Sequence, residues 1–196
     1  PEVALPFRLH ECRVNYKGHE GSPDTPITGI SVRLDDDRAG NLEGDPTTSS
    51  FAVLGQQMTA KIYAFKRGKA DTYRRNEGII FVVNGQTHGH LTRNFFSQKR
   101  VGMNRLEDSI LVMVDCSRIS GRAREDLFMN SRDRLRSGEL RDSIEQELES
   151  IIKNHEGLRE LRERRRREDV ESRLQDSKPL KEMLEIIVRR YPSLAA

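Results

Sequence analysis

The sequence contains little cysteine, few aromatic residues and no long hydrophobic run. Its 196 residues include two cysteines, no tryptophan and 6% aromatic side chains. Cys12 and Cys116 lack the Cys-x-x-Cys spacing of zinc sites and disulfide frameworks, which favours two structural thiols in a reducing compartment. The scarcity of aromatic residues argues against a surface that stacks the bases of single-stranded nucleic acid.

The chain also lacks an apolar segment long enough for a membrane helix and a large excess of charge of one sign. No apolar run approaches the roughly 18 residues of a membrane-spanning helix, and the mean hydropathy is -0.73. We therefore expect no membrane segment, no signal peptide and a cytoplasmic location. The 34 basic and 31 acidic residues give a net charge of +3, which is too even for the strong positive field of a dedicated nucleic-acid binder.

The length of the chain allows one domain with an appendage or two small domains. The first half has the alternating pattern of strands, and the second half has the pattern of helices. We therefore expect an α+β domain over residues 1–120 and a helical segment over residues 121–196. The chain opens on Pro1 rather than on methionine, which leaves open that it is a piece of a longer protein.

Three strands are predicted in the first half, over residues 7–16, 29–34 and 58–65, where apolar and polar residues alternate. The alternation is clearest in the third of them. Residues 18–28 and 35–50 are rich in glycine, proline, aspartate, serine and threonine. That composition is typical of turns, so we expect two long loops.

Two later runs, residues 78–84 and 109–115, are almost continuously apolar. Such runs predict strands that are buried on both faces. Between them we expect a helix over residues 90–99, with Thr87 as its cap. Because a helical connection separates the two strands, they are free to lie parallel.

Helices are predicted from Ser120 almost to the end of the chain, because apolar residues recur there at spacings of three and four. Gly138 and Gly157 are expected to break the helical pattern, and Pro179 to restart it. The expected helices cover residues near 123–128, 140–152, 158–174 and 180–190.

Patterns that suggest catalysis or metal binding lack the partners that such chemistry needs. His88 and His90 are two residues apart, but no third metal ligand stands near them. Cys116 ends an apolar strand, yet a cysteine nucleophile needs a neighbouring histidine that the sequence does not indicate. There is no phosphate-binding Gly-x-x-x-x-Gly-Lys loop either. We expect neither a catalytic residue nor a metal site in this chain.

The most informative stretch is Glu77-Gly78-Ile79, followed after the strand by Gln86-Thr87-His88-Gly89-His90-Leu91. It resembles the transducer domain of the GHKL ATPases, the superfamily of gyrase-type topoisomerases, MutL-type mismatch-repair proteins and ninety-kilodalton heat-shock chaperones. The resemblance covers about residues 50–135. It implies an α+β fold with a mixed sheet of four to five strands in β-β-β-α-β-α order, followed by a helical C-terminal segment.

The resemblance also implies a site. In the gyrase branch, a Gln-Thr-Lys loop at the start of the helix reaches the terminal phosphate of the nucleotide. Gln86 and Thr87 match its first two positions, and His88 falls where the family has lysine. Lysine is charged at neutral pH, whereas histidine is mostly neutral unless an anion charges it. Either the phosphate charges His88, or the loop is no longer a sensor, or a neighbouring cation, Arg93, Lys99 or Arg100, contacts the phosphate instead.

The family's nucleotide pocket is not found in this chain. That pocket needs a helix with an asparagine for magnesium, an Asp-x-Gly-x-Gly turn and a Gly-rich lid. The resemblance therefore implies no cofactor here, with ATP and magnesium bound by a domain upstream. It implies that this segment relays nucleotide state to a partner or a DNA-handling module. The parent would be a bacterial protein of DNA repair or phage defence, and a homodimer is one option. Whether the parent protein is an ATPase stays open.

A rival interpretation rests on the run Arg164, Arg165, Arg166 and Arg167, which suggests contacts with nucleic-acid phosphates. Between Arg118 and Arg173, however, 14 arginines and one lysine face 14 acidic residues. A solvated helix held by internal ion pairs is therefore the alternative for this run. The rival function is a non-enzymatic module that binds protein or nucleic acid through its charged C-terminal helices.

Overall fold

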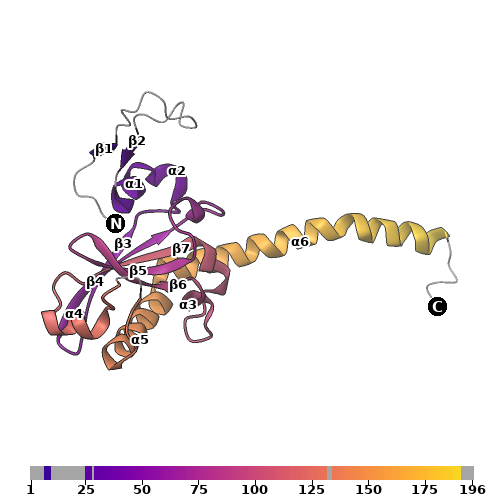
Figure 1. Cartoon of the computed structure of the whole chain (residues 1–196). Coiled ribbons are helices and arrows are strands. Elements are labelled where there is room, and N and C mark those ends of the chain that lie inside the picture. The colour runs from indigo at the N-terminus through magenta and orange to yellow at the C-terminus, as the bar shows by residue number, and fades with distance from the viewer. Residues whose placement is uncertain (1–6, 10–24, 28, 132–133, 191–196) are drawn as a thin grey trace. The chain divides into compact units, whose positions relative to one another are not determined.

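The computed structural model describes residues 7–9, 25–27, 29–131 and 134–190, with side chains for residues 29–30, 32–131 and 134–173. The chain forms two compact units, Pro1–Asn154 and His155–Ala196. The first contains β-sheet and helices, and the second is helical (Figure 1).

A five-stranded mixed sheet forms the centre of the first unit (Figure 1). Its spatial order is β3-β4-β7-β5-β6, with β5 and β7 parallel and the other neighbours antiparallel. The α+β class and the parallel pairing of the two apolar runs are thereby confirmed. The strands are β3 (Thr47–Val53), β4 (Gln56–Ala64), β5 (Glu77–Val83), β6 (Gln86–Thr92) and β7 (Ile110–Asp115).

The predicted strand over residues 29–34 is wrong, because this segment is the helix α1 (Ile30–Asp36). Ile30 and Leu34 pack into the same buried cluster, whereas Val32 between them is 38% exposed. The apolar spacing that matters is therefore four residues, which is the period of a helix. The alternation of apolar and polar residues that suggested a strand arose from Val32 alone, which lies on the surface.

Residues 35–50 are not the long loop that their composition predicts. They include the end of α1, the short helix α2 (Arg38–Asn41) and the start of β3. The first half of β3 is exposed and polar, as an edge strand can be, so it gave no apolar signal. Strand β1 (Phe7–Leu9) pairs antiparallel with β2 (Thr25–Ile27), which lies in a predicted loop. The rest of the first predicted strand and loop lies outside the described residues.

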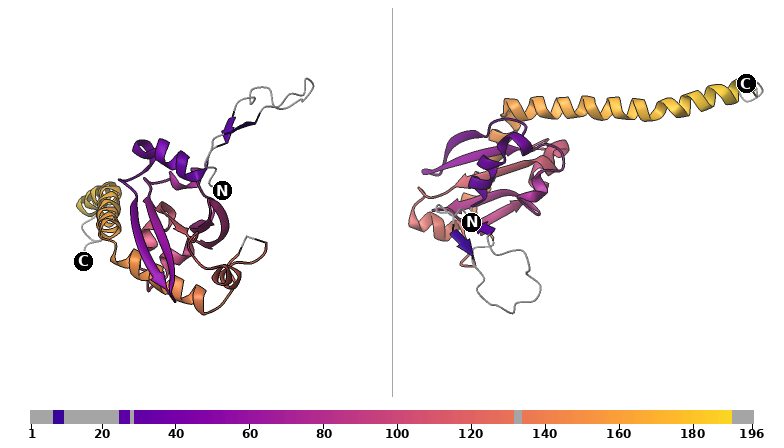
Figure 2. Two further views of the ribbon diagram at one scale, coloured as in Figure 1. Left: turned by 90° about the vertical axis from the view of Figure 1, so that its left-hand side faces the viewer. Right: turned by 90° about the horizontal axis from the view of Figure 1, so that it is seen from above.

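One face of the sheet is covered by α1 (Figure 2), with Leu42 just after α2 and Ala70 of the 3-10 turn η1 (Ala70–Thr72) in the same buried cluster. The hydroxyl of Tyr73, just after η1, donates to Asp37 Oδ2 at 2.6 Å and accepts from Asn41 Nδ2 at 2.8 Å. These bonds tie α1 and α2 to the β4–β5 connection. The cluster beneath them contains Leu34, Leu42, Tyr63, Phe65, Ala70, Tyr73, Ile80, Val82, Leu111 and Met113.

The other face is covered by α4 (Gly121–Leu127) and α5 (Glu139–Asn154), on the side opposite α1 in both views (Figures 1 and 2). Ile144, Leu148 and Ile152 are the buried residues of α5, as their spacing of four predicts. The predicted break at Gly138 is also confirmed, because α5 begins one residue later. Between β6 and β7 lie α3 (Asn94–Ser97) and the 3-10 helix η2 (Asn104–Ser109).

The second unit contains α6 (Glu156–Arg190). The His155 side chain caps its start, with Nδ1 accepting a hydrogen bond from the Leu158 N–H at 3.1 Å. The helix runs across Pro179, where the sequence predicts a new start. A proline removes one backbone hydrogen bond from a helix, but the turns on either side can continue. No helix in the described part of the chain combines the length and apolarity needed to cross a membrane.

Candidate functional site at the β5–β6 turn

The segment after β5 is a tight hairpin turn. Asn84 and Gly85 have φ angles of 48° and 76°, the left-handed values that a two-residue type I′ turn requires, and Asn-Gly is its preferred sequence. Gln86 is therefore the first residue of β6. The expected strand-to-helix corner and the helix over residues 90–99 are wrong. Only Asn94–Ser97 is helical there.

Gln86, Thr87 and His88 lie at the turn end of β6, which is an edge strand of the sheet. Gln86 is exposed, and the other two are half-buried. Val82 pairs with Thr87 and Phe81 with Gly89, so His88 is the extra residue of a β-bulge. The His88 ring packs against the Phe128 ring, with centroids 5.3 Å apart. The three side chains therefore do not converge on one point, and Gln86 alone is fully on the surface.

The end of β7 meets this turn, because parallel strands end at the same edge of a sheet. The Cys116 N–H donates to the Val82 carbonyl at 2.8 Å, and the Asn84 N–H donates to Ser117 Oγ at 2.8 Å. The Ser117 N–H in turn donates to Asp115 Oδ1 at 2.9 Å. Two polar segments that are separate in the sequence thus form one corner in the fold.

Cys116 has no nucleophilic character in this corner. Its side chain is fully buried, and burial, with Asp115 as the next cause, raises the pKa of the thiol to about 12. The thiol stays protonated at neutral pH, whereas a reactive cysteine needs a thiolate. The structural role that the sequence favours for Cys116 fits this environment.

Two further features shape the corner. Arg124 of α4 donates from Nη2 to the Ser117 carbonyl at 2.6 Å, which holds α4 to the segment after β7. Beside Asp115 a hollow of about 400 Å³ opens on the sheet. One carboxylate and one guanidinium line it, so its charge is balanced. Its lining residues are Ser50, Phe51, Ala52, Gln57, Met58, Thr59, Asp115 and Arg118.

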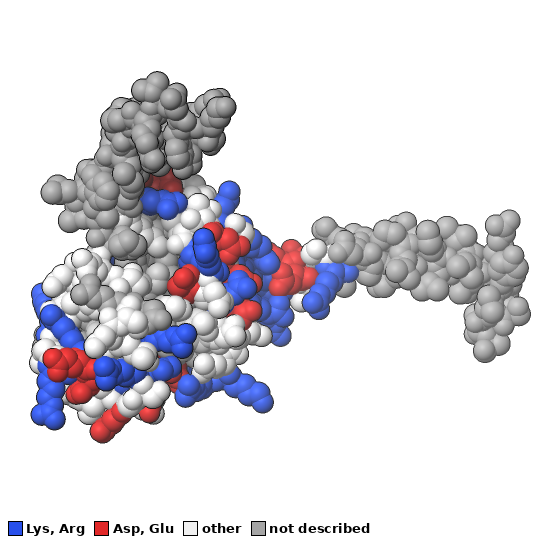
Figure 3. All heavy atoms as spheres, in the orientation of Figure 1, with Lys and Arg blue, Asp and Glu red and all other residues white. Residues whose placement is uncertain are grey.

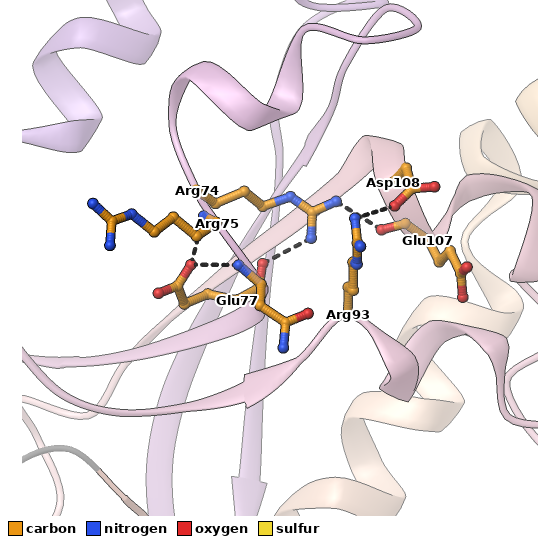
Figure 4. A network of polar contacts seen from close by, with 7 residues as sticks. Arg74, Arg75, Glu77, Arg93, Glu107 and Asp108 are labelled. Atoms are coloured by element: carbon orange, nitrogen blue, oxygen red, sulfur yellow. Dashed lines mark hydrogen bonds and ion pairs between the residues drawn. The ribbon is translucent and has the colours of Figure 1, made fainter.

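The opposite end of the hairpin is fixed by a buried network (Figure 4). Arg74, only 4% exposed, donates to the carbonyl oxygens of Glu77 and Glu107, each at 2.7 Å. Its burial, and next the charge of Arg93, lower the pKa of the guanidinium. The Glu77 carboxylate accepts from the backbone N–H of Arg75 at 2.8 Å. The start of β5 is therefore tied to η2.

The cations predicted to assist at the phosphate are not gathered around Gln86. Arg93 directly follows the last residue of β6. The segment from Gln86 to Arg93 spans about 20 Å as a strand, whereas it would span about 10 Å as the expected helix. The Arg93 guanidinium pairs with Asp108 (Figure 4). Arg100 Nε pairs with Glu149 Oε1 of α5 at 2.7 Å. Lys99 is exposed, beyond α3.

The arginine run lies on α6 among ion pairs. Arg164 Nε lies 3.8 Å from Glu168 Oε1, and Arg166 Nη1 lies 3.5 Å from Glu163 Oε2. These pairs agree with the internally paired helix, but Arg165 is only 3% exposed, so the run as a whole is not a solvated face. Nucleic-acid contacts of Arg164, Arg165, Arg166 and Arg167 stay a prediction. On the face of the molecule in Figure 3, acidic and basic side chains are interspersed.

Within the residues whose placement is described, no three His, Cys, Asp or Glu side chains are grouped so that they could hold a metal ion. Comparisons with protein-family models, curated proteins and solved structures find no match for this chain. The function must therefore be argued from the geometry of the corner and from the motif that it contains.

Proposed function

We propose that this chain relays the nucleotide state of a GHKL-type ATPase from an upstream ATP-binding domain to a partner or DNA-handling module. The observation that carries the proposal is the position of Gln86. It matches the first position of the Gln-Thr pair in the motif that this chain resembles, and it is exposed at the first residue of an edge strand. A phosphate presented by another domain can therefore approach it from solvent.

The chemistry suits an amide better than a catalytic group. A glutamine side chain donates N–H bonds to phosphate oxygens and takes up no proton. Gln86 would thus detect whether the terminal phosphate is present, while ATP and magnesium are held by the other domain. A relay requires a contact that differs between nucleotide states, and loss of the terminal phosphate removes this one.

The mechanics of the sheet suit a relay as well. Within the described residues β6 pairs with β5 alone, so its turn end can shift without breaking the central strands. The bulge at His88 further reduces the regular pairing near the turn. A change at Gln86 would therefore move the end of β6 before it disturbs the core.

The test uses the full-length protein that contains this chain and the proposed ATP-binding domain. Gln86→Ala should lower kcat for ATP hydrolysis at least about tenfold, because it removes a donor to the charge that develops on the phosphate. Nucleotide affinity should change little. Hydrogen exchange, followed with and without a non-hydrolysable ATP analogue, should show nucleotide-dependent protection of the β5–β6 turn.

The matched control is Thr92→Ala, which changes an exposed residue at the far end of the same strand. It should leave both turnover and exchange unchanged. The proposal is overturned if Gln86→Ala retains normal turnover and the turn of the unaltered protein exchanges equally with and without nucleotide. A reading frame with no GHKL pocket upstream of this chain would also contradict it.

A further inference from the structure

The segment that follows α4 lies directly on β6. Phe128 ends α4, and it forms an antiparallel bridge with Leu135. The Arg136 N–H donates to the Leu127 carbonyl at 2.8 Å, and Arg136 Nε donates to the Phe128 carbonyl at 3.0 Å. Phe128 and Leu135, called the bridge pair below, are both buried. Burial and these hydrogen bonds therefore fix the bridge pair in place.

Gly89 of β6 is in tight contact with this bridge pair. A Cβ atom built on Gly89 would lie 2.8 Å from Leu135 Cδ2, so the end of this leucine side chain would have to shift to make room for it. Glycine weakens a strand interior, and it often marks a close approach by another segment. At Gly89 the approaching atoms belong to Leu135 and to the Arg134 backbone. Because packed interiors have little free space, an inward shift of β6 at this point would press on the Leu135 side chain.

Other contacts join the same two elements. The His88 ring packs against Phe128, and Arg124 links α4 to Ser117, which accepts the Asn84 N–H at the turn. The turn end of the β5–β6 hairpin is thus joined to the bridge pair by the His88–Phe128 contact, and to α4 indirectly through Ser117. The contacts lie next to Gln86, at the end of β6 that the proposed function expects to move.

The bridge pair leads directly into α5. Arg136, which closes the bridge, is followed within three residues by Glu139, the first residue of α5. The Asp142 N–H already bonds the Gly138 carbonyl at 3.0 Å, so the helix is regular from its first turn. A displacement of Leu135 therefore reaches the start of α5 over a short, hydrogen-bonded path.

We propose that β6 transmits its movement to α5 through the bridge pair, with Gly89 as the contact point and His88 as a positioning residue. This inference rests on the proposed function, because it takes Gln86 as the input. Rigid-body displacement of packed elements is a common way to carry such a signal.

The experiment is a double-mutant cycle in the full-length protein, with Gly89→Ala, Leu135→Ala and the two combined. Gly89→Ala adds a methyl group where Leu135 lies, and Leu135→Ala removes the obstacle. Gly121→Ala is the control, because no atom lies within 4 Å of a Cβ there. Hydrogen exchange of the β5–β6 hairpin and of α5 is followed with and without magnesium and a non-hydrolysable ATP analogue.

In the unaltered protein and in Gly121→Ala, nucleotide should change exchange in both the hairpin and the first turns of α5. Each single variant should keep the hairpin response and reduce the α5 response at least about fivefold, which corresponds to a typical coupling between sites. The double variant should recover most of the α5 response. Its loss of Tm without nucleotide should be smaller than the sum of the two single losses.

The outcomes separate this inference from the proposed function. If the hairpin of the unaltered protein does not respond to nucleotide, the proposed function fails and the inference fails with it. If the hairpin responds but α5 responds equally in all variants, the inference alone is overturned. Should Gly89→Ala not fold, Phe128→Leu removes the ring contact with His88 but keeps an apolar side chain, and the same loss of α5 response is expected.

Discussion

Strands β5 and β6 are neighbours of equal length, yet their surroundings are opposite. In β5 every residue from Gly78 to Val83 is buried, and the strand is hydrogen-bonded on both sides. In β6 only Gly89 and Leu91 are buried, one side is paired, and His88 is the extra residue of a bulge. Opening free energies within one protein span a wide range. The contrast indicates a rigid strand next to one that can shift.

The two ends of the β5–β6 hairpin also differ in how firmly they are held. At the start of β5, the buried guanidinium of Arg74 is bonded to two backbone carbonyls (Figure 4). At the turn, Asn84 is held by one hydrogen bond to a hydroxyl. Movement should therefore pivot about the Arg74 end and be largest at Gln86.

The largest effect should come from the rigid strand. Phe81→Ala removes a fully buried ring from β5 and should lower the free energy of unfolding by about 3–5 kcal/mol. Thr92→Ala on β6 changes an exposed residue and should alter it by less than about 0.5 kcal/mol. Urea unfolding of the two variants measures both values. Equal losses would refute the contrast between the strands.

A smaller effect concerns the buried end of β5, where Cys116 bonds Val82. The pKa of its thiol is raised from 9.0 to about 12 by burial, and next by Asp115. Between these values the unfolded chain loses the thiol proton and the folded chain keeps it, so stability falls as pH rises. The slope reaches about 1.4 kcal/mol per pH unit.

Cys116→Ala should remove the contribution of the thiol to the slope of stability against pH. The measurement is urea unfolding of both proteins between pH 8 and pH 11, within the window set by the two pKa values. Tyr73, whose pKa burial also raises, contributes equally to both proteins and cancels in the difference. If the two stabilities fall in parallel over this range, the thiol is not buried as described.

The smallest effect compares two turns with the same backbone. Leu54-Gly55 joins β3 to β4, and Asn84-Gly85 joins β5 to β6, each with φ values of 48° and 76°. Leucine is strained in this left-handed conformation, whereas asparagine tolerates it. Leu54→Asn should therefore stabilise the protein by about 0.5–1 kcal/mol, and Asn84→Leu should destabilise it by a similar amount. Opposite signs in thermal unfolding would contradict this.

The sequence correctly predicts those elements whose hydrophobic pattern arises from a single strand or helix. Continuous apolar runs mark β5 and β7, and a spacing of four marks α5. Strand β6 was missed because Leu91, Phe95 and Phe96 have helical spacing, although Leu91 belongs to β6 and the two phenylalanines to α3. One pattern there arises from two elements, and local periodicity cannot separate them.

For the site, Asn84-Gly85 did carry a hairpin signal in the sequence, and it outweighs the helical spacing that follows. The rest of the corner has no local signature. Arg124 reaches Ser117, and His88 reaches Phe128, only because α4 packs on the sheet. Both contacts depend on the tertiary fold, and His88 and Phe128 are also distant in the sequence, so a single sequence does not reveal them.

The bulge at His88 has a consequence for the molecule among its own copies. An edge strand offers unpaired backbone groups to any strand that can align with them, and a regular flat edge invites endless sheet extension. The doubled position in β6 disturbs that alignment. At this edge of the sheet, the bulge therefore disfavours pairing with a strand of a second copy.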